Sequence, residues 1–97
     1  MKVYKGPDIF VPNAFTPNND GRNDVLKAIP VGIKVFKYFV IYNRYGEKIF
    51  HSTNPSQGWN GNLNGRLQPN GVFVWYAEGE DVNGKLITRK GTVLLLQ

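Results

Sequence analysis

Short runs of β-branched and aromatic residues recur along this chain, and glycine, asparagine or proline separates almost every run from the next. This spacing leaves little room for helices and is typical of an all-β sandwich. A chain of 97 residues is long enough to bury one hydrophobic core without cross-links. We therefore expect a small antiparallel β-sandwich of immunoglobulin-like or Greek-key type, with about six to seven strands.

The chain is expected to form one domain over residues 9–97, preceded by an artificial start or a linker remnant at 1–8. The dipeptide Tyr45-Gly46 predicts a hairpin turn, and Asn83-Gly84 is a strong signal for a two-residue type I′ turn. Gly91 interrupts the last apolar run and suggests a bulge or bend. The expected strands are 9–11, 25–29, 33–44, 47–52, 72–81 and 85–96, with residues 53–70 irregular.

Two of the expected strands are apolar on both faces, whereas one face of a strand in a two-layer sandwich is normally polar. One apolar face must build the core, so the other is expected to bring aromatic side chains near the surface. Such a stripe is typical of a docking surface, but cross-strand aromatic pairs also stabilise small sheets, and both interpretations stay open. We expect two or three of these residues near the surface: Tyr38, Tyr42, Trp75 and Tyr76.

Residues 12–24 are rich in proline, asparagine, aspartate and glycine, which excludes a helix or a central strand. Phe15 lies within this segment and is expected to be buried, where it would pin the loop to the core. Thr16 and Lys27 stand where an EF-hand needs its first and last acidic ligands, so an EF-hand is excluded. Side-chain hydrogen bonds to the loop's own backbone are the favoured interpretation. A weak calcium site is the alternative, with ligands from Asn18, Asp20, Asn23 and Asp24; no other cofactor is expected.

Composition excludes several classes of function. The chain has no cysteine and one histidine, which argues against a transition-metal site. His51 has no evident nucleophile partner, and no phosphate-binding glycine loop precedes a helix, so the chain is not expected to be an enzyme. The net charge of +5 is scattered and is expected to serve solubility, so no nucleic-acid partner is predicted. No apolar run is long enough to span a membrane.

Five blocks of sequence, in order, resemble the gliding motility-associated C-terminal domain family. The first is the segment from Pro12 to Asp24, and the second is Ile41-Tyr42-Asn43-Arg44-Tyr45-Gly46-Glu47-Lys48-Ile49-Phe50. The others are Trp59-Asn60-Gly61, Pro69-Asn70-Gly71-Val72-Phe73 and Gly91-Thr92-Val93-Leu94-Leu95. The blocks cover most of residues 9–97. The residues that we take as the structural signature are Pro12, Asn13, Phe15, Pro17, Gly21, Trp59, Gly61, Gly71 and Gly91.

This resemblance implies a type B sorting domain of the type IX secretion system of gliding bacteria. Such a domain is a C-terminal address that is covalently continuous with an upstream cargo, often a large surface adhesin or another secreted protein. The implied partners are outer-membrane components of the type IX machinery, including a substrate-specific integral-membrane protein. The implied route leads through the periplasm and the outer membrane to the cell surface or the medium.

Two segments are expected to form the partner-binding surface. The hairpin places side chains on an exposed turn, and the final strand is expected at a sheet edge, where its backbone could be read by strand addition. The predicted binding residues are Tyr42, Arg44, Tyr45, Glu47, Thr92, Leu94 and Leu96. The alternative function is a carbohydrate-binding β-sandwich that would stack sugars on Trp59, Trp75 or Tyr45.

Overall fold

The computed structural model describes residues 6–17, 25–63 and 65–96. Every regular element in these ranges is a β-strand, and no helix in them could span a membrane. The strands are β1 (Asp8–Phe10), β2 (Ala14–Phe15), β3 (Ile29–Val31), β4 (Ile33–Tyr42), β5 (Lys48–Ser52), β6 (Asn62–Leu63), β7 (Arg66–Leu67), β8 (Gly71–Asp81) and β9 (Leu86–Leu95).

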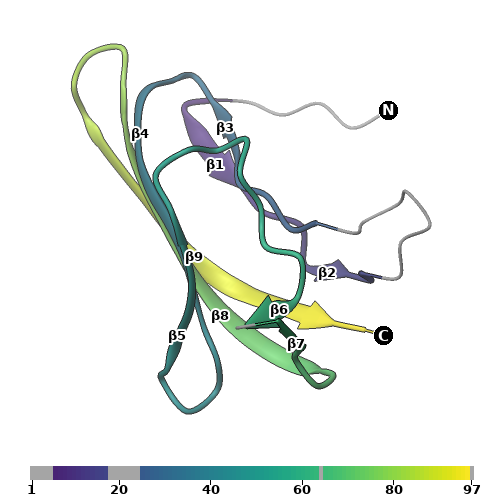
Figure 1. Cartoon of the computed structure of the whole chain (residues 1–97). Helices are drawn as coiled ribbons and strands as arrows, with labels where there is room; N and C mark the ends of the chain where they lie inside the picture. Colours follow the sequence, from purple (N-terminus) through teal and green to yellow (C-terminus); the bar gives the residue numbers. More distant parts are fainter. Residues whose placement is uncertain (1–5, 18–24, 64, 97) are drawn as a thin grey trace.

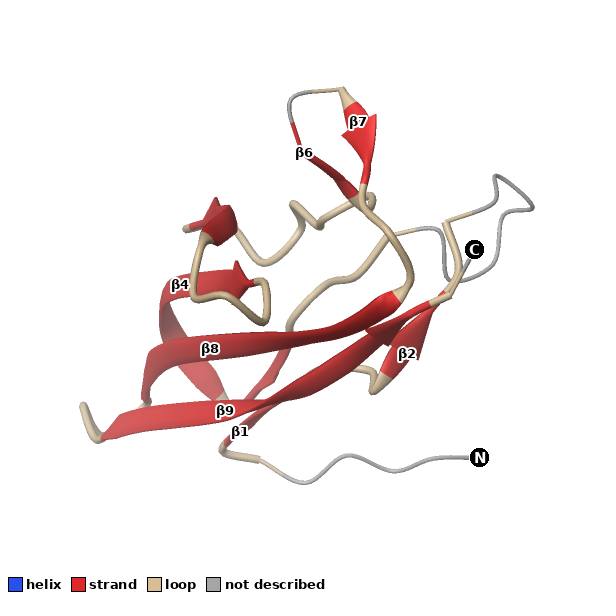
Figure 2. Ribbon diagram, turned by 90° about the horizontal axis from the view of Figure 1, so that it is seen from below, coloured by secondary structure: helices blue, strands red, loops and turns tan. Residues whose placement is uncertain are grey.

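A five-stranded sheet in the order β2-β9-β8-β4-β5 is the main layer of the fold. The pairs β1-β3 and β6-β7 form two smaller sheets. Figure 1 shows β1 and β3, together with the connection that carries β6, on the same side of the large sheet, and Figure 2 shows the sheet from below. The all-β sandwich is therefore confirmed. The large sheet is mixed, because β2 runs parallel to β9.

The core lies between the large sheet and this covering layer, and Trp59 is at its centre. Its ring centroid is 5.5 Å from that of Phe15 on β2 and 5.1 Å from that of Phe73 on β8. The indole Nε1 donates a hydrogen bond to the carbonyl of Asn62 at 2.8 Å. The backbone of Trp59 also pairs with Leu26, with both N–H···O distances below 3.0 Å. Through its ring and its backbone, Trp59 thus joins the segments of Phe15, Leu26 and Phe73, which are distant in the sequence.

The two hairpins β4-β5 and β8-β9 have the same loop geometry. Asn43 and Asp81 each stand immediately before a three-residue loop. The side-chain oxygen of each accepts hydrogen bonds from the backbone N–H groups two and four residues later. Gly46 and Gly84 follow with φ of 84° and 78°, a conformation that glycine adopts without strain. The predicted hairpins are confirmed, but Asn83-Gly84 belongs to a three-residue loop and not to a two-residue turn.

The strand expected at residues 25–29 and the irregular structure expected throughout 53–70 are wrong, since the latter range contains β6 and β7. Residues 25–29 do not form a continuous strand: only Leu26 makes a bridge, and β3 begins at Ile29 and includes Pro30. The proline is tolerated because β3 pairs with β1 alone, so a missing N–H leaves no neighbour unsatisfied.

Gly91 shows no bulge, because its pairing with Trp75 continues the regular β8-β9 register. Its small size is required by packing. A Cβ at this position would lie 3.0–3.1 Å from atoms of the Trp75 indole. The glycine therefore lets a large ring lie flat across the neighbouring strand.

Phe15→Ala tests whether the N-terminal segment is held to the core by this ring. Phe15 is 2% exposed, so truncation leaves a cavity next to Trp59 and should lower the free energy of unfolding by about 3–5 kcal/mol. The measurement is chemical denaturation, with Tyr45→Ala as a matched aromatic truncation at a residue that is 79% exposed. Equal stability of the two variants would contradict the packing described here.

Candidate partner-binding surface

The large sheet has two unlike faces. Phe73, Trp75 and Ala77 of β8 are buried in the core, whereas Val72, Val74 and Tyr76 alternate with them on the other side. We call this other side the open face, because no further described segment covers it (Figure 1). The open face also carries three residues of β4 and three of β9, namely Tyr38, Val40 and Tyr42, and Lys90, Thr92 and Leu94.

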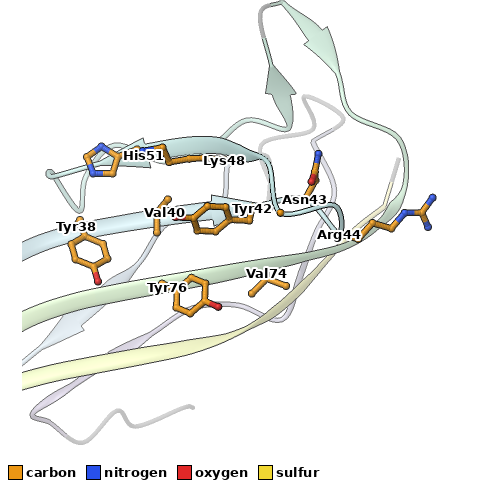
Figure 3. Close-up of a pocket in the computed structure, with 10 residues that line it drawn as sticks. Tyr38, Val40, Tyr42, Asn43, Arg44, Lys48, His51, Val74 and Tyr76 are labelled. Atoms are coloured by element: carbon orange, nitrogen blue, oxygen red, sulfur yellow. The ribbon is translucent and has the colours of Figure 1, made fainter.

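A hollow of about 720 Å³ follows β4 on the open face, between β5 and β8. We call it the aromatic groove. Figure 3 shows the rings of Tyr38, Tyr42 and Tyr76 gathered with Val40 and Val74 on this face of β4 and β8. The remaining lining residues come from β5 and from the hairpin loop, and they are Asn43, Arg44, Gly46, Lys48 and His51.

The rings of the groove are arranged by contacts with one another. Tyr42 and Tyr76 meet edge to face, with centroids 5.7 Å apart and an interplanar angle of 82°. Tyr38 lies against His51 at 6.5 Å with an angle of 22°. Such cross-strand pairs stabilise the sheet. Both interpretations of the aromatic stripe therefore remain compatible with the structure.

The charge of the groove differs between its two ends. At the far end from the hairpin loop, the Tyr38 hydroxyl donates to Glu78 at 3.4 Å, and Lys37 lies 3.8 Å from Glu78 and 3.4 Å from Glu80. Burial, and after it the neighbouring Glu78 carboxylate, raises the pKa of Tyr38 above its ordinary value of 10.0. Near the hairpin the charged lining residues are Arg44 and Lys48, and no carboxylate of the described residues lines the groove there.

The hairpin loop is rigid at its base and exposed at its tip. Asn43 holds the base through its side-chain oxygen and also donates to the Glu47 carboxylate at 3.0 Å. At the tip, Arg44 donates to the Tyr45 hydroxyl at 3.0 Å, and its guanidinium carbon lies 5.1 Å from the centre of that ring. Tyr45 is 79% exposed. The loop thus presents a cation and an aromatic ring in a fixed arrangement.

The structure places the two predicted binding segments on the same face of the sheet. The final strand, however, does not end at a free sheet edge. Tyr42 and Thr92 lie in one row across the sheet, separated by Val74. The end of β9 is not a free edge, because β2 pairs with it: Leu94 N–H donates to Asn13 and Leu96 N–H donates to Phe15. The expectation of strand addition to the end of β9 is therefore wrong. The edge strands of the sheet are β2 and β5.

Two of the three rings proposed for sugar stacking are inaccessible. Trp59 is 2% exposed and Trp75 is 7% exposed, and both belong to the core. Trp75 is also not part of the surface stripe, but Tyr38, Tyr42 and Tyr76 lie on the open face, as expected for two or three of the four residues. The structure thus removes two of the three rings on which the carbohydrate alternative depends and leaves only Tyr45 of that set accessible to a ligand.

The loop that was considered for calcium lies outside the described residues. This applies to the four candidate ligands Asn18, Asp20, Asn23 and Asp24 and to the signature residue Gly21. In residues 6–17, 25–63 and 65–96 no group of three acidic or histidine side chains is placed to hold a metal. Of the other signature residues, Phe15 and Trp59 are buried in the core, whereas Pro12 and Asn13 are exposed. Pro17 lies against the buried Gly61, and Gly71 begins β8 opposite Leu95.

Six groove residues are absent from the binding residues and the aromatic stripe predicted from the sequence, namely Val40, Asn43, Gly46, Lys48, His51 and Val74. Val40 and Val74 could have been found from the sequence, because the expected strands 33–44 and 72–81 carry apolar residues on both faces. Lys48 offered no signal of its own, because its place beside the groove depends on the pairing of Tyr42 with Lys48 across a β-bulge.

Comparison with known proteins identifies one family. The family model described as CHU_C type IX secretion signal domain matches residues 9–95. No curated protein and no solved structure matches the chain.

The raised pKa of Tyr38 predicts a specific loss of stability in alkali. The folded pKa is above the unfolded value of 10.0, so the stabilising contribution is complete below that value and is lost as the pH rises through the folded pKa. Tyr38→Phe should therefore flatten the alkaline part of a plot of melting temperature against pH. Glu78→Gln should move the phenol titration, followed by tyrosinate absorbance, back toward its ordinary value. An alkaline profile that is the same in wild type and Tyr38→Phe would contradict this account.

Proposed function

The chain belongs to the family of CHU_C type IX secretion signal domains, and we propose that it directs an attached protein to the type IX machinery for export across the outer membrane. The cargo is covalently continuous with this domain and reaches the cell surface or the medium through the periplasm. The match over residues 9–95 carries the proposal. The domain acts as a recognition element and not as an enzyme.

The machinery reads the domain in its folded form. The residues that define the hairpin loop and the open face come from β4, β5, β8 and β9, so they are brought together only when the sheet has formed. A surface that is already assembled loses little conformational entropy on docking. The partners are outer-membrane components, including a substrate-specific integral-membrane protein.

The hairpin tip and the adjoining open face form the recognition surface. Arg44, Tyr45 and Glu47 are exposed, and Tyr42 joins the tip to the open face. Thr92 and Leu94 of β9 and Leu96, which follows its end, continue the same surface, and Leu94 and Leu96 are 37% and 40% exposed. Exposed tyrosine and arginine side chains in one region are typical of protein interfaces.

A reporter fusion tests the export role. The chain is fused behind a signal peptide and a neutral reporter in a host that has the type IX machinery and the natural partner. We expect the reporter outside the outer membrane. Arg44→Ala and Tyr45→Ala should lower export while the purified domain melts as wild type, because side chains at an exposed tip contribute little to the core.

The matched control is Lys85→Ala in the corresponding loop at the other end of the sheet. It should export as wild type, since that loop has the same backbone geometry but lies away from the open face near Tyr42. A wild-type fusion that stays in the periplasm would contradict the sorting role. Normal export of both hairpin variants would remove the hairpin tip from the recognition surface.

A further inference from the structure

We propose that the aromatic groove binds an extended, acidic segment of a protein partner, with apolar side chains on the groove floor and carboxylates at the hairpin end. The inference rests on the proposed function, because it names the chemistry of the partner that takes up the signal. It concerns the hollow between β5 and β8, which adjoins the hairpin tip and shares Arg44 with it.

The groove has the shape of an extended peptide. It follows β4 from Tyr38 to the hairpin loop, and a strand rises about 3.3 Å per residue, so Tyr38 and Tyr42 are roughly 13 Å apart along it. This length fits about four or five residues of an extended chain. The groove is open along the sheet, so a segment can lie in it without displacing any described element.

The floor is apolar and preformed. Val40 is 5% exposed although no described segment covers it, because the neighbouring side chains close around it. Val74 and the edge-to-face pair of Tyr42 and Tyr76 complete the floor. Rings that are already held by one another lose little rotamer freedom when a partner docks, which favours binding of apolar side chains.

The charges at the hairpin end select an acidic partner. The groove lining contains Arg44, Lys48 and His51 but no carboxylate. The ion pairs within the described parts of the chain involve Lys37 and Arg89, so neither Arg44 nor Lys48 has a carboxylate within 4.0 Å there. The opposite end is already occupied by the Glu78 and Glu80 carboxylates beside Lys37. Among the described residues that line the groove, carboxylates of a bound segment therefore find unpaired positive charges only near the hairpin, at Arg44 and Lys48.

Two other occupants fit the groove less well. A single-stranded nucleic acid needs flat ring faces on which bases stack, but Tyr42 and Tyr76 meet at 82° and Tyr38 is stacked on His51. A second copy of this chain brings the same cationic rim and a net charge of +5 to the contact, which opposes association.

Fluorescence anisotropy with labelled probes tests the inference on the purified 97-residue chain. The main probe is a short synthetic peptide in which glutamate alternates with leucine and phenylalanine. One control peptide has lysine in place of glutamate, and another has serine in place of the apolar residues. A single-stranded oligonucleotide is the fourth probe. We expect the acidic, apolar peptide to bind most tightly and its affinity to fall as salt is raised.

Charge reversal locates the binding site. The double variant Arg44→Glu with Lys48→Glu should weaken binding of the acidic, apolar peptide by about tenfold or more. Both residues are exposed, so the fold should be kept, which a melting curve verifies. The control is Lys85→Glu with Lys90→Ala and Arg66→Ala, a set that changes the net charge by the same amount. The affinity of this control should stay within about twofold of wild type, because only Lys90 borders the open face.

The outcomes separate this inference from the export role. Preference for the acidic, apolar peptide that is lost only in the double variant supports the inference. Equal binding of the lysine peptide, preference for the oligonucleotide, binding of no peptide, or unchanged affinity in the double variant overturns it. The peptide assay needs no secretion machinery. If the wild-type reporter is exported but any of these negative results is obtained, the export role stands and the groove is rejected as a binding site. If the peptide binds but the reporter is not exported, the export role is rejected.

Discussion

Burial of the Trp59 ring is the interaction on which the rest of the fold depends. The indole packs on Phe15 and Phe73, its Nε1 is satisfied by the Asn62 carbonyl, and its backbone pairs with Leu26. These contacts join the large sheet to segments with little regular structure of their own. Because short pairs such as β1-β3 and β6-β7 are marginal in isolation, the covering layer depends on contacts of this kind. Within the described residues, the same arrangement leaves the open face without a cover.

The division of the sheet into two faces explains how a small domain can be both stable and recognisable. The strands β4 and β8 each contribute one apolar set to the core and another to the open face, as the alternation of Trp75 with Val74 and Tyr76 shows. The core set is sealed by Trp59 and its neighbours. The other set forms a preformed surface whose rings are fixed by one another. The export signal that we propose is thus a property of the folded sheet, and unfolding would destroy it.

The sequence predicted the fold class and the long strands because their signals are local. The expected ranges 33–44 and 72–81 agree closely with β4 and β8, since alternation and turn residues mark their ends. The errors involve partners that are distant in the sequence. Gly91 is small because Trp75 crosses it, Pro30 is allowed because β3 has one neighbour, and the end of β9 is not a free edge because β2 pairs with it. For the same reason the groove was predicted only as an aromatic stripe, and Lys48 was missed.

The most direct test is hydroxyl-radical footprinting of the chain, both alone and bound to outer-membrane secretion components. It asks whether the core face of the sheet is buried and whether the open face contacts the partner. In the free chain, Tyr42 and Tyr76 should react, whereas Trp59 and Trp75 should be protected by burial. In the complex, Tyr42 and Tyr76 should become protected, and the two tryptophans should be unchanged. Continued reactivity of both tyrosines in the complex, or reactive tryptophans in the free chain, would contradict the account.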